Sequence, residues 1–443
     1  MTSFFHSYDL RGVFPDEIGL DEAEKVGKAY GTHTETEEVL IGRDGRENGS
    51  EVAQAFIDGV CATGTNVAYV GMAPTPLVYF GQVRDGFDSA AVVTASHNPP
   101  EYTGFKFNRS GGVAMSRQGG MKNIQDIYES EDFDTGSGTV RETEVMNDYV
   151  REVSELVGSL DLDVLIDCGN GVTGLMARRL FEELGCNVRF INEEVDGSFP
   201  SHLPDPTDEE AQQAVEDAMD GEDLGIIFDG DGDRAGFVLP EHGYIQEDEV
   251  IALLSQQALN HGKGKVIHDL RTSKIVVEKV EEYGGEPVES KVGHTFISEE
   301  IHARDNAVFA GELSGHFYFP VYGFPWDDGL LAGALMAKIA DSQDLVQKLE
   351  DFPDYPVSPE INFECSHERK NDVIKALSQE FSDHDISTMD GVKISFDSGW
   401  ALVRPSSTEP KIRLRCEADT DKELEKIRSQ MESEIKHILV EII

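Results

Sequence analysis

Three segments of the chain repeat one order of elements: an apolar strand, a turn, a helix, and a glycine that leads into a second strand. Two strands joined by a helix form the βαβ unit, which predicts an α/β fold. A glycine just after a helix adopts a left-handed conformation that satisfies the last carbonyls and turns the chain back. The segments begin at EVLIGRDGR, DVLIDCGNG and KVIHDLRTS, and their glycines are Gly64, Gly185 and Gly285. This recurrence at domain-sized spacing predicts three copies of one α/β domain.

A fourth module follows the proline-bearing stretch DFPDYPVSPE, which predicts a linker. The module ends in a segment whose apolar residues recur every three or four positions, as the buried face of one helix requires. These residues are Leu424, Ile427, Met431, Ile435 and Ile438. We assign them to a core and not to function.

The chain is strongly acidic, with 85 Asp and Glu against 37 Lys and Arg, a net charge of -48 at pH 7. Because such a surface repels phosphate backbones, no nucleic-acid or membrane partner is expected. Acidic residues dispersed along the whole chain are typical of salt-accumulating haloarchaea, so we expect a halophilic protein, with an acidic mesophilic protein as the alternative. The mean hydropathy of -0.34, with neither a signal peptide nor an apolar run of membrane-spanning length, predicts a cytoplasmic protein.

The stretch TASHNPP follows the apolar run SAAVV, and its prolines exclude a regular helix or central strand. It predicts an ordered loop at the carboxyl end of a strand, where open α/β sheets bind ligands. Ser96 and His97 lie in this loop. Taken alone, the pair fits a turn stabilised by its own side chains as well as it fits a reactive serine.

The stretch DGDGDR follows the apolar run LGIIF and alternates acidic residues with glycine. In an extended segment, Asp229, Asp231 and Asp233 point to one side, where their charges repel unless a divalent cation collects them. Mg²⁺ suits a site of a few carboxylates completed by a phosphate oxygen. A solvated acidic turn is the alternative reading.

Two later loops carry polar groups of the kind that bind a sugar phosphate. The stretch GELSGH provides Glu312, Ser314 and His316, which suit sugar hydroxyls. The stretch RPSSTEP sets Arg404 beside small hydroxyl residues that can bind a phosphate together with it. A Ser/Thr-rich turn with a surface arginine is the alternative for the second loop.

The four loops together, in order and spacing over almost the whole chain, resemble the α-D-phosphohexomutase family. The resemblance implies four domains around a central cleft, three similar mixed-sheet α/β domains and a smaller C-terminal α+β domain. The expected domains are residues 1–140 with the phosphoserine loop, 141–240 with the metal loop, 241–352 with the sugar loop and 353–443 with the phosphate loop.

The resemblance also implies a role for each motif. Ser96 is the phosphoserine, and it ligates Mg²⁺ together with Asp229, Asp231 and Asp233. The implied catalytic residues are Ser96, Lys106 in YTGFK, His316, and Arg11 in FHSYDLRG, with Lys106 and His316 as the candidates for proton transfer. The implied substrate-binding residues are Tyr8, Arg234, Arg271, His294, Glu312, Ser314, Arg404, Ser406, Ser407 and Thr408.

The implied activity is the interconversion of hexose 1-phosphate and hexose 6-phosphate, with hexose 1,6-bisphosphate as intermediate and activator. SKVGHTFI and GELSGH resemble the phosphomannomutase/phosphoglucomutase branch more than the phosphoglucosamine mutases, which are the alternative. Arg271 stands where that branch often carries a lysine. Outside the mutases, a metal-dependent sugar phosphatase or an inactive sugar-phosphate-binding protein would also fit these motifs. A monomer or homodimer is expected.

Overall fold

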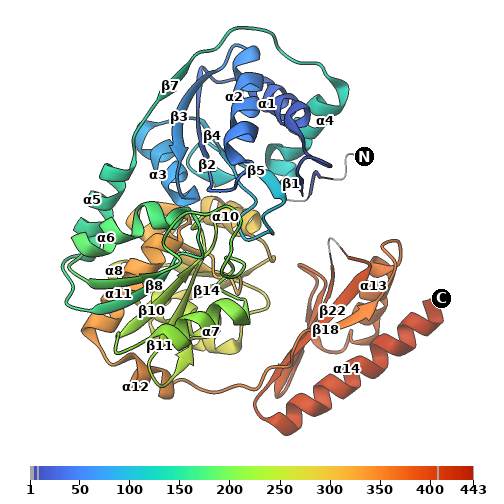
Figure 1. The fold of residues 1–443 in the computed structure, drawn as a ribbon. Helices are drawn as coiled ribbons and strands as arrows, with labels where there is room; N and C mark the ends of the chain where they lie inside the picture. Colours follow the sequence, from blue (N-terminus) through green and yellow to red (C-terminus); the bar gives the residue numbers. More distant parts are fainter. Residues whose placement is uncertain (1–3, 7–8, 407–408, 443) are drawn as a thin grey trace.

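The computed structural model describes residues 4–6, 9–406 and 409–442. They form an α/β fold of four sheets that follow one another along the chain (Figure 1). The first three sheets are mixed and flanked by helices, and the last is antiparallel, which confirms the predicted fold class. The expected domain borders at residues 140, 240 and 352 stay predictions, and domains I to IV below are named in chain order.

Domain I is built on a sheet of order β1-β5-β4-β2-β3-β7, with β6 beside β5. Strands β2, β3, β4 and β7 run parallel, whereas β5 pairs antiparallel with β1 and β4. The strands are β1 (Leu10–Val13), β2 (Glu38–Arg43), β3 (Asn66–Met72), β4 (Ser89–Val93), β5 (Tyr102–Arg109), β6 (Val113–Ala114) and β7 (Val140–Glu142). The helices are α1 (Leu20–Thr34), α2 (Gly49–Ala62), α3 (Thr75–Asp85), a π-helical turn (Arg117–Met121) and α4 (Lys122–Ser130). The fully buried β4 lies inside this sheet, which explains its unbroken apolar sequence.

Domain II has the sheet order β12-β11-β10-β8-β9, parallel at β10-β8-β9 and antiparallel at β12-β11-β10. Its strands are β8 (Asp163–Asp167), β9 (Asn187–Ile191), β10 (Leu224–Phe228), β11 (Ala235–Leu239) and β12 (Gly243–Tyr244). Its helices are α5 (Met146–Val157), a 3-10 turn (Val172–Leu175), α6 (Ala177–Glu183) and α7 (Glu209–Ala218).

Domain III repeats the pattern with the order β14-β13-β15-β16-β17. Its strands are β13 (Lys265–Asp269), β14 (Glu286–Ser290), β15 (Ala307–Gly311), β16 (Phe317–Phe319) and β17 (Phe324–Asp327). Its helices are α8 (Glu247–His261), α9 (Lys274–Glu282), α10 (His294–Ala303), a 3-10 turn (Pro320–Tyr322), α11 (Gly329–Ser342) and α12 (Leu345–Glu350).

Domain IV is an antiparallel sheet of order β18-β22-β21-β20-β19 with helices α13 and α14. Its strands are β18 (Ile361–Glu364), β19 (Asp385–Ser387), β20 (Val392–Phe396), β21 (Gly399–Pro405) and β22 (Lys411–Ala418). Its helices are α13 (Lys370–Glu380) and α14 (Asp421–Ile442). The predicted apolar face of α14 packs on this sheet, with Ile427, Met431, Ile435 and Ile438 buried and Leu424 partly buried.

The glycine prediction holds for two of the three repeats and is wrong by one residue in the third. Gly64 and Gly185 follow α2 and α6 at φ +102° and +92°. After α9 the left-handed residue is Gly284, at φ +77°, and not Gly285. Two adjacent glycines offer the same freedom, and the point where the helix ends decides which of them is used.

Domains I to III are joined by packing, whereas domain IV has a core of its own. One continuous apolar core contains residues of the first three domains, including Leu40, Phe181 and Leu331. The core of domain IV is separate, and a small apolar contact of Leu270 with Trp400 and Leu402 joins it to domain III. The first three domains therefore form one packed body, to which domain IV is more loosely attached (Figure 1).

Within the part of the chain that the structure describes, every helix is too short or too polar to span a bilayer.

Candidate active site

Ser96 lies in the loop that follows β4, as predicted, and is 2% exposed. Its Oγ donates a hydrogen bond to Oδ2 of Asp229 at 2.6 Å and lies 3.1 Å from Nδ1 of His97. Its backbone N–H donates to the hydroxyl of Thr94, and its φ is +50°, which is uncommon outside glycine. The loop thus directs the serine hydroxyl from domain I onto the acidic loop of domain II.

The acidic loop lies between β10 and β11 and brings its three carboxylates together. Asp229, Asp231 and Asp233 are fully buried, and each offers an oxygen within 4.8 Å of the others. The segment is a tight turn and not the extended chain that we expected. The Asp229 carboxylate closes it by accepting from the N–H groups of Gly232 and Arg234, and Gly232 has φ +78°.

The electrostatics of these carboxylates suit a divalent cation. Burial, reinforced by the other two carboxylates, raises the pKa of Asp229, and burial with Asp231 raises that of Asp233. Oδ1 of Asp231 and Oδ1 of Asp233 are buried and find no hydrogen-bond donor among the described residues. Carboxylate oxygens of this kind are the ligands that Mg²⁺ prefers, so the residues present fit such an ion.

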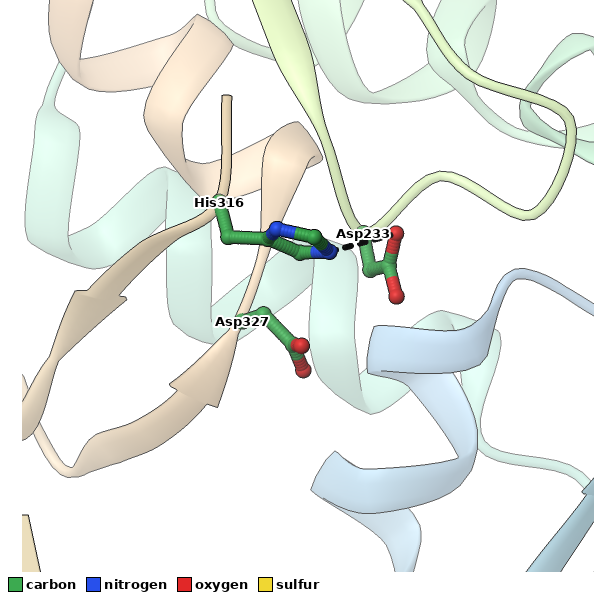
Figure 2. A group of neighbouring side chains, drawn as sticks. All are labelled: Asp233, His316 and Asp327. Carbon is green, nitrogen blue, oxygen red and sulfur yellow. Dashed lines mark ion pairs between the residues drawn. The ribbon is translucent and has the colours of Figure 1, made fainter. Parts of the chain in front are cut away.

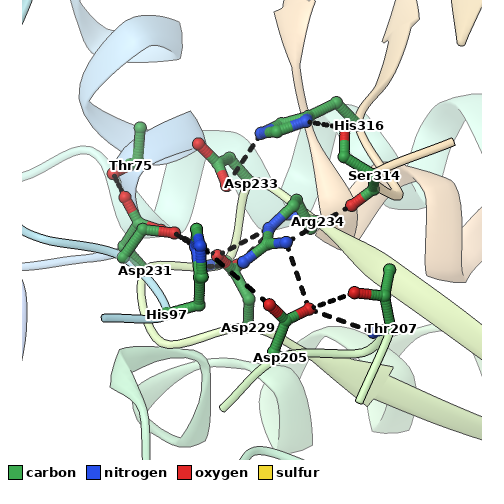
Figure 3. A network of polar contacts seen from close by, with 12 residues as sticks. Thr75, His97, Asp205, Thr207, Asp229, Asp231, Asp233, Arg234, Ser314 and His316 are labelled. Atoms are coloured by element: carbon green, nitrogen blue, oxygen red, sulfur yellow. Dashed lines mark hydrogen bonds and ion pairs between the residues drawn. The ribbon is translucent and has the colours of Figure 1, made fainter. Parts of the chain in front are cut away.

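Two buried cations, Lys106 and Arg234, contact the acidic loop, and Figure 3 shows the second of them. Lys106, on β5, places Nζ 2.8 Å from Oδ2 of Asp231 and also contacts Asp233. Burial alone would lower the pKa of Lys106, but Asp231 and Asp233 raise it, so the ammonium stays charged. For Asp231, burial opposes ionisation, but the charge of Lys106 outweighs it and lowers the pKa.

Arg234 closes the other side of the cluster. Its Nε donates to Oδ2 of Asp229 at 3.2 Å, and its Nη1 donates to Oδ1 of Asp205 at 3.1 Å. Its buried Nη2 finds no acceptor among the described residues. Because Arg234 and Ser96 donate to the same oxygen of Asp229, this unused donor belongs to a side chain that reaches the serine's own acceptor, and it could bind a phosphoryl oxygen.

The loop between β15 and β16 brings domain III into the cluster. Nε2 of His316 lies 3.6 Å from Oδ1 of Asp233, and the hydroxyl of Ser314 lies 2.8 Å from Nδ1 of His316. Asp327, on β17, lies close to both His316 and Asp233 (Figure 2). Burial, with Arg234 nearby, lowers the pKa of His316, which keeps its imidazole neutral.

Glu312 and His294 lie beside this loop. Burial, reinforced by Asp269, raises the pKa of Glu312 to about 7, and its Oε1 accepts from the N–H of Gly293. The imidazoles of His294 and His316 stack with their ring centres 5.8 Å apart. Burial, with Lys106 nearby, lowers the pKa of His294 to about 3.

Among the described residues, the side chains of Arg11 and Arg271 are bound by partners outside the acidic turn. Arg11, on β1, donates to Oδ1 of Asn98 at 2.6 Å and pairs with Asp9. Arg271, after β13, is held by both carboxylate oxygens of Asp269, and the same carboxylate accepts from the N–H of Leu313. The predicted Tyr8 lies outside the described residues.

The predicted phosphate clamp belongs to domain IV. Arg404 lies on β21 and forms two hydrogen-bonded contacts with Oδ2 of Asp390, at 2.9 Å and 2.6 Å. Ser406 is buried, and its carbonyl accepts from Lys370. Asp390 also accepts from the N–H of Val292 in domain III. Ser407 and Thr408 lie outside the described residues.

Sequence reasoning thus found the residues of one contiguous cluster and missed those that hold it. The structure joins Ser96, Lys106, Asp229, Asp231, Asp233, Arg234, Ser314 and His316 through direct contacts. It places Arg404 and Ser406 on a separate domain. The supporting residues that were missed are Arg46, Thr75, Asn98, Asp205, Asp269 and Asp327. DGR and HDLRTS contain two of them, but their local pattern gave no reason to single them out.

Models of the phosphoglucomutase/phosphomannomutase family match this chain domain by domain. The matches are α/β/α domain I at residues 2–135, domain II at 147–243, domain III at 246–355 and the C-terminal domain at 360–434.

Similar proteins are named as sugar-phosphate mutases over their full length. A phosphomannomutase/phosphoglucomutase of Pseudomonas aeruginosa is 35% identical, covering 99% of this chain and 96% of that protein. A phosphomannomutase of Methanocaldococcus jannaschii is 34% identical, covering 99% and 98%. A probable phosphoglucosamine mutase of Methanopyrus kandleri is 33% identical and covers 100% of both chains. Among solved structures, a phosphoglucomutase/phosphomannomutase family protein of Burkholderia thailandensis superposes with a TM-score of 0.92 at 33% identity, covering 99% of this chain and 98% of that one.

Proposed function

Because this chain belongs to the phosphoglucomutase/phosphomannomutase family, and is therefore a phosphohexomutase, we propose that it interconverts the 1- and 6-phosphates of mannose and glucose through a phosphoserine at Ser96. The observation that carries this proposal is the 2.6 Å hydrogen bond from Oγ of Ser96 to Asp229, one of three buried carboxylates that lie together. A hydroxyl so placed lies where a phosphoryl group and a divalent cation can share ligands.

The reaction comprises two phosphoryl transfers in opposite directions. In the first, the phosphoryl group on Oγ of Ser96 passes to the free hydroxyl of a hexose monophosphate, which gives up its proton and yields hexose 1,6-bisphosphate. The bisphosphate then turns over within the site. In the second, Oγ of Ser96 takes the other phosphoryl group, and the sugar hydroxyl left behind regains a proton. The serine ends as it began, and the phosphate has changed position.

The chain's own residues supply charge, orientation and proton transfer. Arg234 binds the phosphoryl group through its free Nη2, and Arg11 adds positive charge on the other side of the loop. His316 and Lys106 are the candidates that exchange the proton with the sugar hydroxyl. Mg²⁺, bound by Asp229, Asp231 and Asp233 with Ser96, would neutralise charge on the transferring phosphoryl group.

Substrate binding extends over domains III and IV. Glu312, Ser314 and His294, together with Arg271, bind the sugar, and Arg404 with Ser406 binds the phosphate that is not being transferred. The proposal gives Tyr8, Ser407 and Thr408 the same substrate-binding role. Since domain IV has a core of its own, it is the element that can loosen while the bisphosphate turns. The protein acts in the cytoplasm as a monomer or homodimer, without a nucleic-acid partner.

A phosphoglucosamine mutase is the second candidate, favoured by the full-length similarity to the Methanopyrus kandleri protein. The kcat/KM values for the 1-phosphates of mannose, glucose and glucosamine distinguish the two candidates. We expect the mannose and glucose values to exceed the glucosamine value by at least about tenfold.

The test of the proposal is conversion of glucose 1-phosphate or mannose 1-phosphate to the 6-phosphate, with Mg²⁺ and a trace of bisphosphate, at low and at molar KCl. Conversion that requires the bisphosphate supports the phosphoserine route. Release of one inorganic phosphate for each substrate consumed would instead identify a sugar phosphatase. Binding of the substrate without turnover in either salt would identify a binding protein.

A further inference from the structure

The loop that carries Ser96 rests on one buried guanidinium. Arg46 lies in the turn between β2 and α2 and is 2% exposed. Its Nη2 donates to the carbonyls of Ser96 and Asn98 at 2.8 Å and 2.6 Å. Its Nη1 donates to the carbonyls of Pro99 and Tyr102 at 2.6 Å and 3.2 Å. Four carbonyls from one end of the loop to the other therefore converge on one side chain.

The fifth N–H donor of Arg46 binds a carboxylate, which balances the positive charge of the guanidinium. Its Nε donates to Oδ2 of Asp44 at 3.1 Å, and Oδ1 of the same carboxylate accepts from the backbone N–H of Arg46. A guanidinium has five N–H donors in a fixed fork, and all five have acceptors here. The pair is buried together, so neither charge is left without a partner.

The bracing acts on a part of the loop that would not hold its shape unaided. A serine at φ +50° is in a sparsely populated conformation, which persists only where the surroundings over-determine it. The hydrogen bond from Arg46 to the Ser96 carbonyl fixes the peptide that follows this residue. Since the backbone direction at Ser96 determines where Oγ points, the bracing also sets the 2.6 Å contact with Asp229.

Arg46 is itself held by domain II. The ring of Phe199 lies against its guanidinium, with the central carbon 5.2 Å from the ring centre. Phe199 belongs to the same domain as the acidic turn and is 7% exposed. The side chain that shapes the serine loop is thus seated on the domain that carries Asp229.

We propose that Arg46 is a positioning residue for phosphoryl transfer, which sets the direction of the Ser96 hydroxyl through the four loop carbonyls. The proposal rests on the function proposed above, in which Ser96 carries the phosphoryl group. Arg46 acts through the loop without touching the substrate. Its loss should therefore slow the transfer step and leave the binding of hexose phosphate intact.

The test compares Arg46→Met and Arg46→Lys with the wild type. Dephosphorylated enzyme is mixed with glucose 1,6-bisphosphate and Mg²⁺, and phosphoenzyme is followed by rapid quench and intact-protein mass. We expect Arg46→Met to be phosphorylated about 100-fold more slowly, because a displacement of about 1 Å at a reacting group has that effect. Lysine has three donors for the five acceptors, so the phosphorylation rate of Arg46→Lys should lie between those of the wild type and Arg46→Met. In both variants the KM for glucose 1-phosphate should stay within about twofold.

Arg84→Met is the matched control, because Arg84 also lies in domain I but pairs with Asp85 and Asp148, which are not part of the serine loop. It should be phosphorylated at the wild-type rate. If Arg46→Met does not fold, Arg46→Lys alone decides. A folded Arg46→Met variant phosphorylated within threefold of the wild type, an Arg46→Lys variant phosphorylated as fast as the wild type, or a variant whose KM rises as much as its kcat falls, overturns the inference. A wild type that is never phosphorylated at Ser96 contradicts the proposed function instead.

Discussion

The Nζ atom of Lys106 lies 2.8 Å from Oδ2 of Asp231, with both side chains buried where domain I meets domain II. This ammonium offsets part of the repulsion among three carboxylates that share one turn. The stability of the cluster and its affinity for metal are therefore coupled through a single lysine.

Replacing Lys106 with methionine should make stability depend on metal. Removing one partner of a buried ion pair lowers stability by about 3–5 kcal/mol, so the variant should unfold at a lower temperature in EDTA. Excess Mg²⁺ should recover much of the loss, because it supplies the missing positive charge. Calorimetry in EDTA and in Mg²⁺ measures the loss of stability and its recovery. Lys25→Met, which removes an ion pair with the exposed Glu131, is the control and should show the same Mg²⁺ response as the wild type. If Mg²⁺ stabilised Lys106→Met no more than it stabilises the wild type, the coupling between stability and metal affinity would be contradicted.

Ser96→Ala should abolish the phosphoenzyme and mutase turnover together. The expected loss in kcat is at least about 1,000-fold, since the variant lacks the hydroxyl that faces Asp229. Intact-protein mass after incubation with bisphosphate should show one added phosphoryl group on the wild type and none on the variant. Ser110→Ala, at an exposed position of the same domain, should behave as the wild type. A phosphate retained on Ser96→Ala would refute the assignment.

Arg404→Met should weaken substrate binding more than it slows chemistry. Charge-assisted hydrogen bonds to a phosphate contribute about 1.5–3 kcal/mol, which corresponds to a KM higher by about tenfold or more. The kcat at saturating hexose phosphate should change little by comparison. Steady-state kinetics distinguish the two effects. Arg428→Met, which removes ion pairs on α14 of the same domain, is the control. A fall in kcat at constant KM would place Arg404 in the transfer step instead.

The buried pair of His202 and Asp167 should make stability fall as the pH rises. Nε2 of His202 lies 2.8 Å from Oδ2 of Asp167. Burial alone would lower the pKa of His202, but the hydrogen bond and charge of Asp167 outweigh it and raise the pKa above its usual 6.5. The contribution is complete below about pH 6.5 and is lost as the pH rises through the raised value. Urea unfolding between about pH 6 and pH 9 should show this decline, and His202→Asn should flatten it. An unchanged pH slope in the variant would contradict the assignment.

The net charge of -48 leads us to predict a halophilic protein. Salt at molar concentration reduces the range of charge repulsion to about 3 Å, so the thermal midpoint should rise markedly from low to molar KCl. Equal midpoints at both salt concentrations would favour an acidic mesophilic protein.

The sequence singled out most residues that the structure brings together around Ser96, but not the residues that hold them in place. Ser96 and Asp229 stand in short motifs, TASHNPP and DGDGDR, and the four motifs taken together resemble one family. Arg46 could not be found in this way, because its acceptors are backbone carbonyls about fifty residues further on, which carry no residue-type signature. The pair of Asp205 with Arg234 is likewise formed only when the chain folds.

Local geometry was the other limit of prediction. The acidic residues converge because Asp229 closes a tight turn around Gly232, whereas their alternation in sequence predicted an extended segment. Alternation and turn both bring the carboxylates together, so the predicted convergence is found although the predicted backbone conformation was wrong.

The left-handed backbone at Ser96 restricts which hydroxyl residues can replace it. Threonine carries the same reactive group, but its branched Cβ is crowded at positive φ, where serine and glycine are tolerated. A loop of this shape therefore selects the side chain by its bulk as well as by its nucleophile. Any residue that enters this position during evolution must first fit the backbone, and only then can its hydroxyl carry phosphate.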